Sequence, residues 1–218
     1  MKTCGNMKTY KTIFFDWNGT LSISLFWDQW KDPAHPRHEW YAPLSRYLLG
    51  ENIPIVMEWM RGKVDAEDIT ALLSDRFGYS RETIFQDLKE SCEAMRLVSD
   101  EVFPLVRKLR NNGTKCVIAT DNMDTFTRFT VPALRLSEHF DGILNSFDIG
   151  LLKFDANDDS IPFFDEYLEK NDLKYKDVAL IDDCTDKSGI YEKRGFDILQ
   201  VFSSDDFVRK LRQLTLEK

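Results

Sequence analysis

The chain has 218 residues, of which 43% are hydrophobic and 30% charged, and its formal net charge is −8. This length suits one domain, or a domain with a modest insertion. The acidic balance without a basic patch argues against nucleic acid and anionic membranes as partners, and no apolar stretch approaches the roughly 20 residues needed to span a bilayer.

The chain begins MKTCGNMKTYK, in which basic residues are not followed by an apolar core. We therefore expect no secretory signal, and we leave open whether translation starts at Met1 or at Met7. Four cysteines are scattered without metal-type spacing: Cys4, Cys92, Cys116 and Cys184. This scattered distribution of cysteines predicts reduced thiols and a cytoplasmic location.

Four near-continuous apolar runs are typical of strands covered on both faces of a parallel sheet. They are 12–16 (TIFFD), 115–120 (KCVIAT), 178–182 (VALID) and 198–202 (ILQVF), and 142–145 (GILN) is a weaker fifth. Helical patterns alternate with them at 102–110, 161–170 and 205–214. This alternation predicts an α/β fold with a doubly wound, mainly parallel, Rossmann-like sheet.

The segment between the first two strands is far too long for a simple crossover. It carries helical patterns at 42–49, 53–61, 66–77 and 81–96 and no convincing strand. Asp65 and Ser80 are expected N-caps within it. We therefore expect a discontinuous core of residues 1–21 and 99–218, with residues 22–98 forming an inserted helical cap.

Aromatic residues and histidines are crowded into residues 26–40, FWDQWKDPAHPRHEW. Each aromatic residue taken singly favours packing inside a small helical domain. The segment as a whole is nevertheless the best candidate for contacts with a substrate between cap and core. The histidines do not form a zinc motif; they are His35, His38 and His139.

Polar residues follow the predicted strands, at the edge where open α/β sheets bind ligands. In chain order they are Asp16, Thr120, Asp121, Asn122, Lys153, Asp182 and Asp183. A carboxylate can attack phosphorus in line, and further carboxylates can hold Mg²⁺. A threonine hydroxyl and loop N–H groups can hold phosphate oxygens, and a lysine can neutralise the charge that develops.

Four stretches resemble the motifs of the haloacid dehalogenase-like (HAD) hydrolase superfamily, in order and in spacing. They are DWNGT at 16–20, VIATDN at 117–122, LLKFD around Lys153, and ALIDD at 179–183. The helical insertion after the first motif resembles a C1-type cap, which belongs to the subfamily I phosphatase type. The resemblance implies a Mg²⁺-dependent phosphomonoester hydrolase that acts on a small phosphorylated metabolite through an aspartyl-phosphate on Asp16.

The resemblance also assigns roles to residues. The catalytic residues would be Asp16, Asn18, Thr120 and Lys153. Contacts with phosphate would come from Trp17, Asn18, Thr120, Asp121, Asn122 and Lys153. Mg²⁺ would bind to Asp16, the backbone carbonyl of Asn18, Asp182 and Asp183. Gly19 would permit a tight loop. Phe154 stands where the family often has proline, Asp186 is a candidate for supporting the metal site, and Cys184 is expected to be a packed thiol.

Asn18 stands where the family usually has an aspartate that serves as acid and base. Such a group typically contributes about 10² to 10⁴ in rate, and asparagine can neither give up nor take a proton at neutral pH. We expect a slower phosphatase, or one that recruits another acid. A long-lived phospho-Asp16, a phosphate-binding pseudoenzyme or interaction module, and a metal-independent 2-haloacid dehalogenase stay open as alternatives. The oligomeric state is not predicted.

Overall fold

The computed structural model describes residues 8–216 of the chain. Cys4 and the alternative start at Met7 lie outside these residues. Within them, no helix combines the length and the apolar character that crossing a membrane requires.

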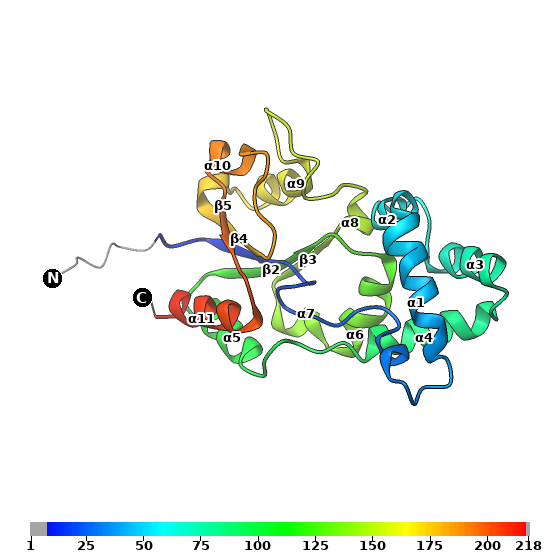
Figure 1. Ribbon diagram of the computed structural model, residues 1–218. Helices are drawn as coiled ribbons and strands as arrows, with labels where there is room; N and C mark the ends of the chain where they lie inside the picture. The colour runs from blue at the N-terminus through cyan, green and yellow to red at the C-terminus, as the bar shows by residue number, and fades with distance from the viewer. Residues whose placement is uncertain (1–7, 217–218) are drawn as a thin grey trace.

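Five parallel strands form one sheet in the order β3-β2-β1-β4-β5, so the predicted α/β fold is confirmed (Figure 1). The strands are β1 (Thr12–Phe15), β2 (Lys115–Thr120), β3 (Gly142–Asn145), β4 (Val178–Asp182) and β5 (Asp197–Gln200). The first strand of the chain lies in the centre, between β2 and β4. The chain builds the sheet outward from β1 to one side and then to the other, which creates a switch point at the ends of these three strands.

Both faces of the sheet are buried, which explains why the strands read as continuous apolar runs. In β1, Ile13 and Phe15 belong to one hydrophobic cluster and Phe14 belongs to the other. Phe14 packs against Phe164 with the ring centroids 4.7 Å apart. Alternate side chains of a strand point to opposite faces, so the three apolar residues of β1 are divided between the two cores.

Helices cover the two faces of the sheet. Figure 1 shows α5 (Val102–Asn111) and α11 (Ser204–Leu214) on one face, with α9 (Pro162–Lys170) and α10 (Ile190–Arg194) on the other. The remaining elements of the core are η3 (Phe126–Thr130), α6 (Val131–Ala133), α7 (Leu136–His139), α8 (Ser146–Ile149) and η4 (Tyr175–Asp177).

A group of helices gathers at one end of the molecule, away from α10 and α11 (Figure 1). It comprises η1 (Asp28–Lys31), α1 (His38–Arg46), η2 (Tyr47–Glu51), α2 (Ile53–Met60), α3 (Ala66–Phe77) and α4 (Arg81–Glu93). The predicted N-caps are confirmed, since the Asp65 carboxylate accepts the Asp68 N–H at 2.9 Å and the Ser80 hydroxyl accepts the Thr83 N–H at 3.3 Å. The boundaries of a cap domain stay a prediction.

Some predicted boundaries were wrong by a few residues. The helix predicted at 42–49 is α1 followed by the wider turn η2, in which the Asn52 N–H bonds to the Tyr47 carbonyl. The helix predicted at 81–96 ends at Glu93. The strand predicted at 198–202 ends at Gln200, because Gln200 already pairs with the last residue of β4.

The tryptophans of segment 26–40 pack inside the helical group. Trp27 and Trp30 are both buried. The Trp27 indole N–H donates to the Ile84 carbonyl at 2.9 Å, and the Trp30 indole N–H donates to the Asp87 carboxylate at 2.6 Å. The packing interpretation is therefore confirmed for these two residues.

Candidate active site

Asp16 emerges at the centre of the switch point, directly after β1. Its N–H donates to the Ile181 carbonyl at 2.9 Å, which keeps the chain in register with β4 for one residue beyond the strand. Thr120 ends β2 on one side and Asp182 ends β4 on the other. Asp16 is only 6% exposed, so its carboxylate depends on neighbouring side chains for solvation.

Lys153 stabilises the Asp16 carboxylate from a loop that is distant in sequence. Its ammonium donates to Asp16 Oδ1 at 2.6 Å and to Asp182 Oδ2 at 2.6 Å. The Lys153 side chain is 12% exposed, and the two carboxylates are more deeply buried still. One ammonium is therefore shared between two acids on neighbouring strands, with little water to screen them.

Side chains from two other elements hold the backbone of Lys153. Its N–H donates to Asp121 Oδ1 at 2.9 Å, and its carbonyl accepts the Tyr191 hydroxyl at 2.6 Å. Asp121 follows β2 and Tyr191 lies on α10. The loop that carries Lys153 is thus held in place through both the N–H and the carbonyl of this residue.

An ion pair connects this loop to the helical group. The Arg61 guanidinium binds the Asp155 carboxylate through both terminal nitrogens, with Nη2 to Oδ1 at 2.6 Å. The same carboxylate accepts the Leu152 N–H at 2.8 Å. Next to Arg61, a Cβ on Gly62 would lie 2.5 Å from the carbonyl oxygen of Phe147. The end of α2 therefore packs closely against the segment that carries Lys153.

The electrostatics of the cluster leave it short of positive charge. Burial raises the pKa of Asp16 from 3.8 to about 7, although Lys153 acts in the opposite direction. Burial would lower the pKa of Lys153, but Asp16 and Asp182 raise it above its ordinary value. Burial also raises the pKa of Asp121. Three acids around one buried ammonium form a site that a further cation would stabilise.

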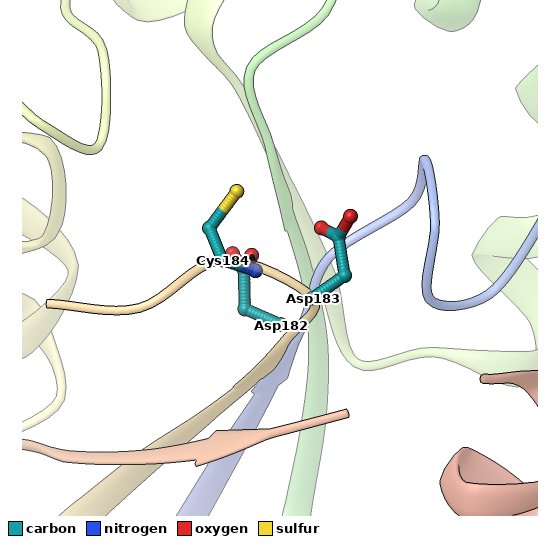
Figure 2. A group of neighbouring side chains, drawn as sticks. All are labelled: Asp182, Asp183 and Cys184. Carbon is teal, nitrogen blue, oxygen red and sulfur yellow. Dashed lines mark hydrogen bonds between the residues drawn. The ribbon is translucent and has the colours of Figure 1, made fainter. Parts of the chain in front are cut away.

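The loop after Asp16 lies close to a fourth carboxylate, that of Asp183, which directly follows β4. Gly19 has a φ of +77°, and a Cβ there would lie 2.6 Å from Cγ of Asp183. Figure 2 shows the Asp183 side chain at the end of β4, directed toward this loop. The backbone conformation at position 19 thus favours glycine, and any side chain there would also force the Asp183 carboxylate to move.

Asp182, Asp183 and Cys184 form a group with the spacing of a metal site. Each offers a ligand atom within 4.8 Å of the others (Figure 2). Burial, followed by the two neighbouring acids, raises the pKa of Cys184 to about 11, so its sulfur stays a thiol. Mg²⁺ prefers oxygen ligands. The carboxylates of Asp16, Asp182 and Asp183 at the joined ends of β1 and β4 therefore fit Mg²⁺, and Cys184 does not.

A cleft of about 560 Å³ opens from this cluster. The predicted site residues that line it are Asp16, Asn18, Asp121, Lys153, Asp182 and Asp183. Asp186 lines it as well, but its carboxylate accepts the Ser188 hydroxyl at 2.7 Å and the Glu192 N–H at 3.1 Å. Asp186 thus holds the start of α10.

Three predicted residues do not line the cleft: Trp17, Thr120 and Asn122. The Trp17 ring is buried against Phe126, with centroids 5.1 Å apart. The Asn122 N–H donates to the Ser146 hydroxyl at 2.9 Å, and that hydroxyl donates to the Asn122 carbonyl at 3.1 Å. Thr120 is 1% exposed, and its hydroxyl has no hydrogen-bond partner among the residues described.

Other features of the site were not predicted from the sequence. Two of them act on Lys153 through the tertiary structure, namely Tyr191 and the Arg61–Asp155 ion pair. No local sequence pattern predicts these contacts. The lining of the cleft contains no residue of segment 26–40, so contacts of that segment with a substrate between cap and core stay a prediction.

Comparisons with known proteins agree on one family. Residues 10–186 match the model of the family described as haloacid dehalogenase-like hydrolase. A search of curated proteins found no match. The structure resembles a predicted HAD-like family hydrolase from Porphyromonas gingivalis, with a TM-score of 0.70 and 18% identity over 97% of this chain and 100% of that one.

Two further structures carry ligands. One is a HAD family enzyme from Bacteroides thetaiotaomicron in complex with magnesium and inorganic phosphate, with a TM-score of 0.63 and 13% identity over 92% of this chain and 98% of that one. The other is L-2-haloacid dehalogenase from Xanthobacter autotrophicus with chloropropionic acid covalently bound. Its TM-score is 0.60, with 15% identity over 96% of this chain and 87% of that one. At these identities the likeness shows the fold alone.

Gly19→Ala tests the two requirements at position 19 separately. Gly78 has a similar φ of +72°, but a Cβ there would have nothing within 4 Å. We expect both alanine variants to lose about 1–2 kcal/mol of unfolding free energy to the left-handed backbone. Only Gly19→Ala should also displace Asp183, so Mg²⁺ should raise the melting temperature of Gly78→Ala and wild type but not of Gly19→Ala. An equal Mg²⁺ effect in both variants would contradict the metal assignment of Asp183.

Asp16→Asn should stabilise the metal-free protein in a pH-dependent way. Because the folded state raises the pKa of Asp16 from 3.8 to about 7, its contribution to stability is present at low pH and is lost as pH rises through this range. The variant avoids that loss, so its advantage in melting temperature should grow from about pH 4 to pH 7 and then level off. Thermal unfolding in the presence of a chelator measures it. Asp75→Asn, which changes an exposed carboxylate on α3, is the matched control. A pH-independent difference would contradict the assignment.

Proposed function

The chain belongs to the haloacid dehalogenase-like hydrolase family, and we propose that it hydrolyses small phosphate monoesters with Mg²⁺, through an aspartyl-phosphate on Asp16. The observation that carries the proposal is the shared ammonium. Lys153 lies 2.6 Å from both Asp16 and Asp182, and Asp183 follows directly. A nucleophilic carboxylate, a buried lysine and two more acids can together support transfer of a phosphoryl group.

The roles of the residues follow from their positions. An Asp16 carboxylate oxygen attacks phosphorus, and Lys153 offsets the negative charge of the phosphoryl group. Thr120 does not line the cleft, but its buried hydroxyl at the end of β2 has no partner among the described residues and would donate to a phosphate oxygen that reached the strand ends. When bound by Asp16, Asp182, Asp183 and the Asn18 carbonyl, Mg²⁺ would lower the repulsion between an anionic nucleophile and an anionic phosphate.

Asn18 limits the range of leaving groups. Asn18 is exposed and lines the cleft, and its amide can donate a hydrogen bond but cannot release a proton. An ester whose leaving group is a strong base therefore reacts slowly unless another acid serves it. Esters with weakly basic leaving groups are affected least.

The acid pair distinguishes this proposal from halide displacement. A halide leaves without a proton, so Asn18 alone is compatible with a 2-haloacid dehalogenase. Displacement of halide by Asp16 has no need of metal, however, and two further carboxylates beside an anionic substrate would oppose its binding. Asp182 and Asp183 become useful when a cation and a phosphate share the site.

Hydrolysis of a panel of phosphate monoesters by wild type and Asp16→Asn tests the proposal. Wild type should turn over activated esters in Mg²⁺, and Asp16→Asn should lose about 10³-fold or more in kcat, since it removes the nucleophile. Release of inorganic phosphate is the measurement. Equal rates in the two proteins would overturn the proposal. Halide release from a 2-haloacid without Mg²⁺ would favour the dehalogenase, and binding of a phosphate analogue without turnover would favour a pseudoenzyme.

Asn18→Asp tests whether the missing acid is the limitation. If nothing replaces it, the variant should gain up to about 10²-fold in kcat on alkyl phosphates and little on nitrophenyl phosphate. An unchanged or lower rate on alkyl phosphates would show that another group already supplies the proton. Asparagine before glycine is prone to deamidation, so peptide mass analysis across Asn18 and Gly19 is the control for wild-type preparations.

A further inference from the structure

The cleft that opens from Asp16 has an extended apolar side. It is lined there by Phe154, Ala156, Leu180, Ile198 and Tyr191. These residues come from the loop after Lys153, from β4 and β5, and from α10. A phosphate group alone would leave most of the 560 Å³ unfilled, so the shape of the cleft suits an ester with a sizeable apolar leaving group.

Phe154 is the most exposed part of this apolar side. It follows Lys153 directly, at a position where the family often has proline, and it is 61% exposed. An aromatic ring beside the charged end of a cleft gains contacts and loses unfavourable hydration when a flat apolar group packs on it. Phe202 is similarly exposed, at 77%, but it does not line the cleft.

The charges of the lining indicate that the leaving group is neutral. Lys187 is the one cation besides Lys153 among the residues that line the cleft. Asp183 and Asp186 line it as well, so a second phosphate or carboxylate on the substrate would meet more acid than base. An uncharged leaving group avoids that repulsion.

Asn18 favours a leaving group that is weakly basic, because the asparagine cannot protonate it. A phenol has a pKa of about 10, whereas an aliphatic alcohol lies near water, at about 16. A phenolate can therefore leave without a proton at a lower activation free energy than an alkoxide. Two independent features thus favour a phenol as the leaving group: the apolar, partly aromatic lining of the cleft and the amide in place of an acid.

We infer that the substrates are phosphate monoesters of phenols, with the aromatic ring against Phe154 and the phosphate between Asp16 and Lys153. This inference rests on the proposed phosphatase function. An Asp16 oxygen forms a bond to phosphorus while the bond from phosphorus to the phenolic oxygen breaks, and phenolate leaves with the electron pair. Water then attacks phosphorus, the bond to Asp16 breaks, and the proton of the water passes to the phosphate released.

Three esters separate binding of the ring from departure of the leaving group. Phenyl phosphate offers a ring and a phenolate, benzyl phosphate offers the same ring and an alkoxide, and methyl phosphate offers neither. We expect phenyl and benzyl phosphate to have similar KM values, lower than that of methyl phosphate. We expect kcat on phenyl phosphate to exceed that on benzyl phosphate by about 10²-fold or more, since no positioned acid compensates.

Phe154→Ala tests the assignment of the ring to the cleft. It should raise KM for phenyl and benzyl phosphate by about three- to tenfold, the range expected from loss of one aromatic contact, and leave KM for methyl phosphate unchanged. Phe154→Tyr should retain the wild-type KM. Phe202→Ala removes another largely exposed ring, one that lies outside the cleft, and is the matched control. Thermal unfolding of each variant checks that it is folded.

The outcomes are distinguishable from failure of the proposed function. Equal kcat values on phenyl and benzyl phosphate would overturn the phenolic assignment while leaving a phosphatase. An unchanged KM for phenyl phosphate in Phe154→Ala would overturn the placement of the ring. Absence of turnover on every ester, nitrophenyl phosphate included, would overturn the proposed function itself.

Discussion

The contact on which the site depends is one ammonium held between two buried carboxylates. Lys153 approaches Asp16 and Asp182 at 2.6 Å each, and these acids leave the ends of adjacent strands, where β1 and β4 run in parallel register. Burying such a group costs several kcal/mol per ion before any attraction is counted. The fold sustains that cost because β1 is central and apolar side chains cover both faces of it. Stability elsewhere thus permits a site that is itself electrostatically unsatisfied.

The position of the ammonium is set by contacts that converge on an irregular loop. Asp121 holds the N–H of Lys153, Tyr191 holds its carbonyl, and Arg61 reaches the same loop through Asp155. These three come from the end of β2, from α10 and from the helical group. A displacement of any one of these elements therefore changes the distance between the lysine and Asp16. The helical group contributes to the charge geometry of the site although it does not line the cleft.

The sequence was sufficient for the parts of the molecule that follow from local patterns. The strand that ends before Asp16 is apolar throughout because both its faces are buried, and Asp65 predicts a helix start because its carboxylate caps the Asp68 N–H. Contacts between distant segments could not be predicted in this way. Arg61 and Tyr191 are ordinary surface and core residues in any local pattern, and only the packed chain shows that both act on the loop of Lys153.

The predicted residues that lie away from the cleft show the same limit. A motif places Thr120 and Asn122 at the end of one strand, but side chains two apart in an irregular turn need not face the same space. The Asn122 side chain accepts the Met123 N–H at 2.9 Å, whereas the Thr120 hydroxyl is buried without a partner among the described residues. A buried hydroxyl left unpaired costs about 1–3 kcal/mol. Under the phosphatase function that we propose, a phosphate oxygen that accepted a hydrogen bond from this hydroxyl would offset that cost.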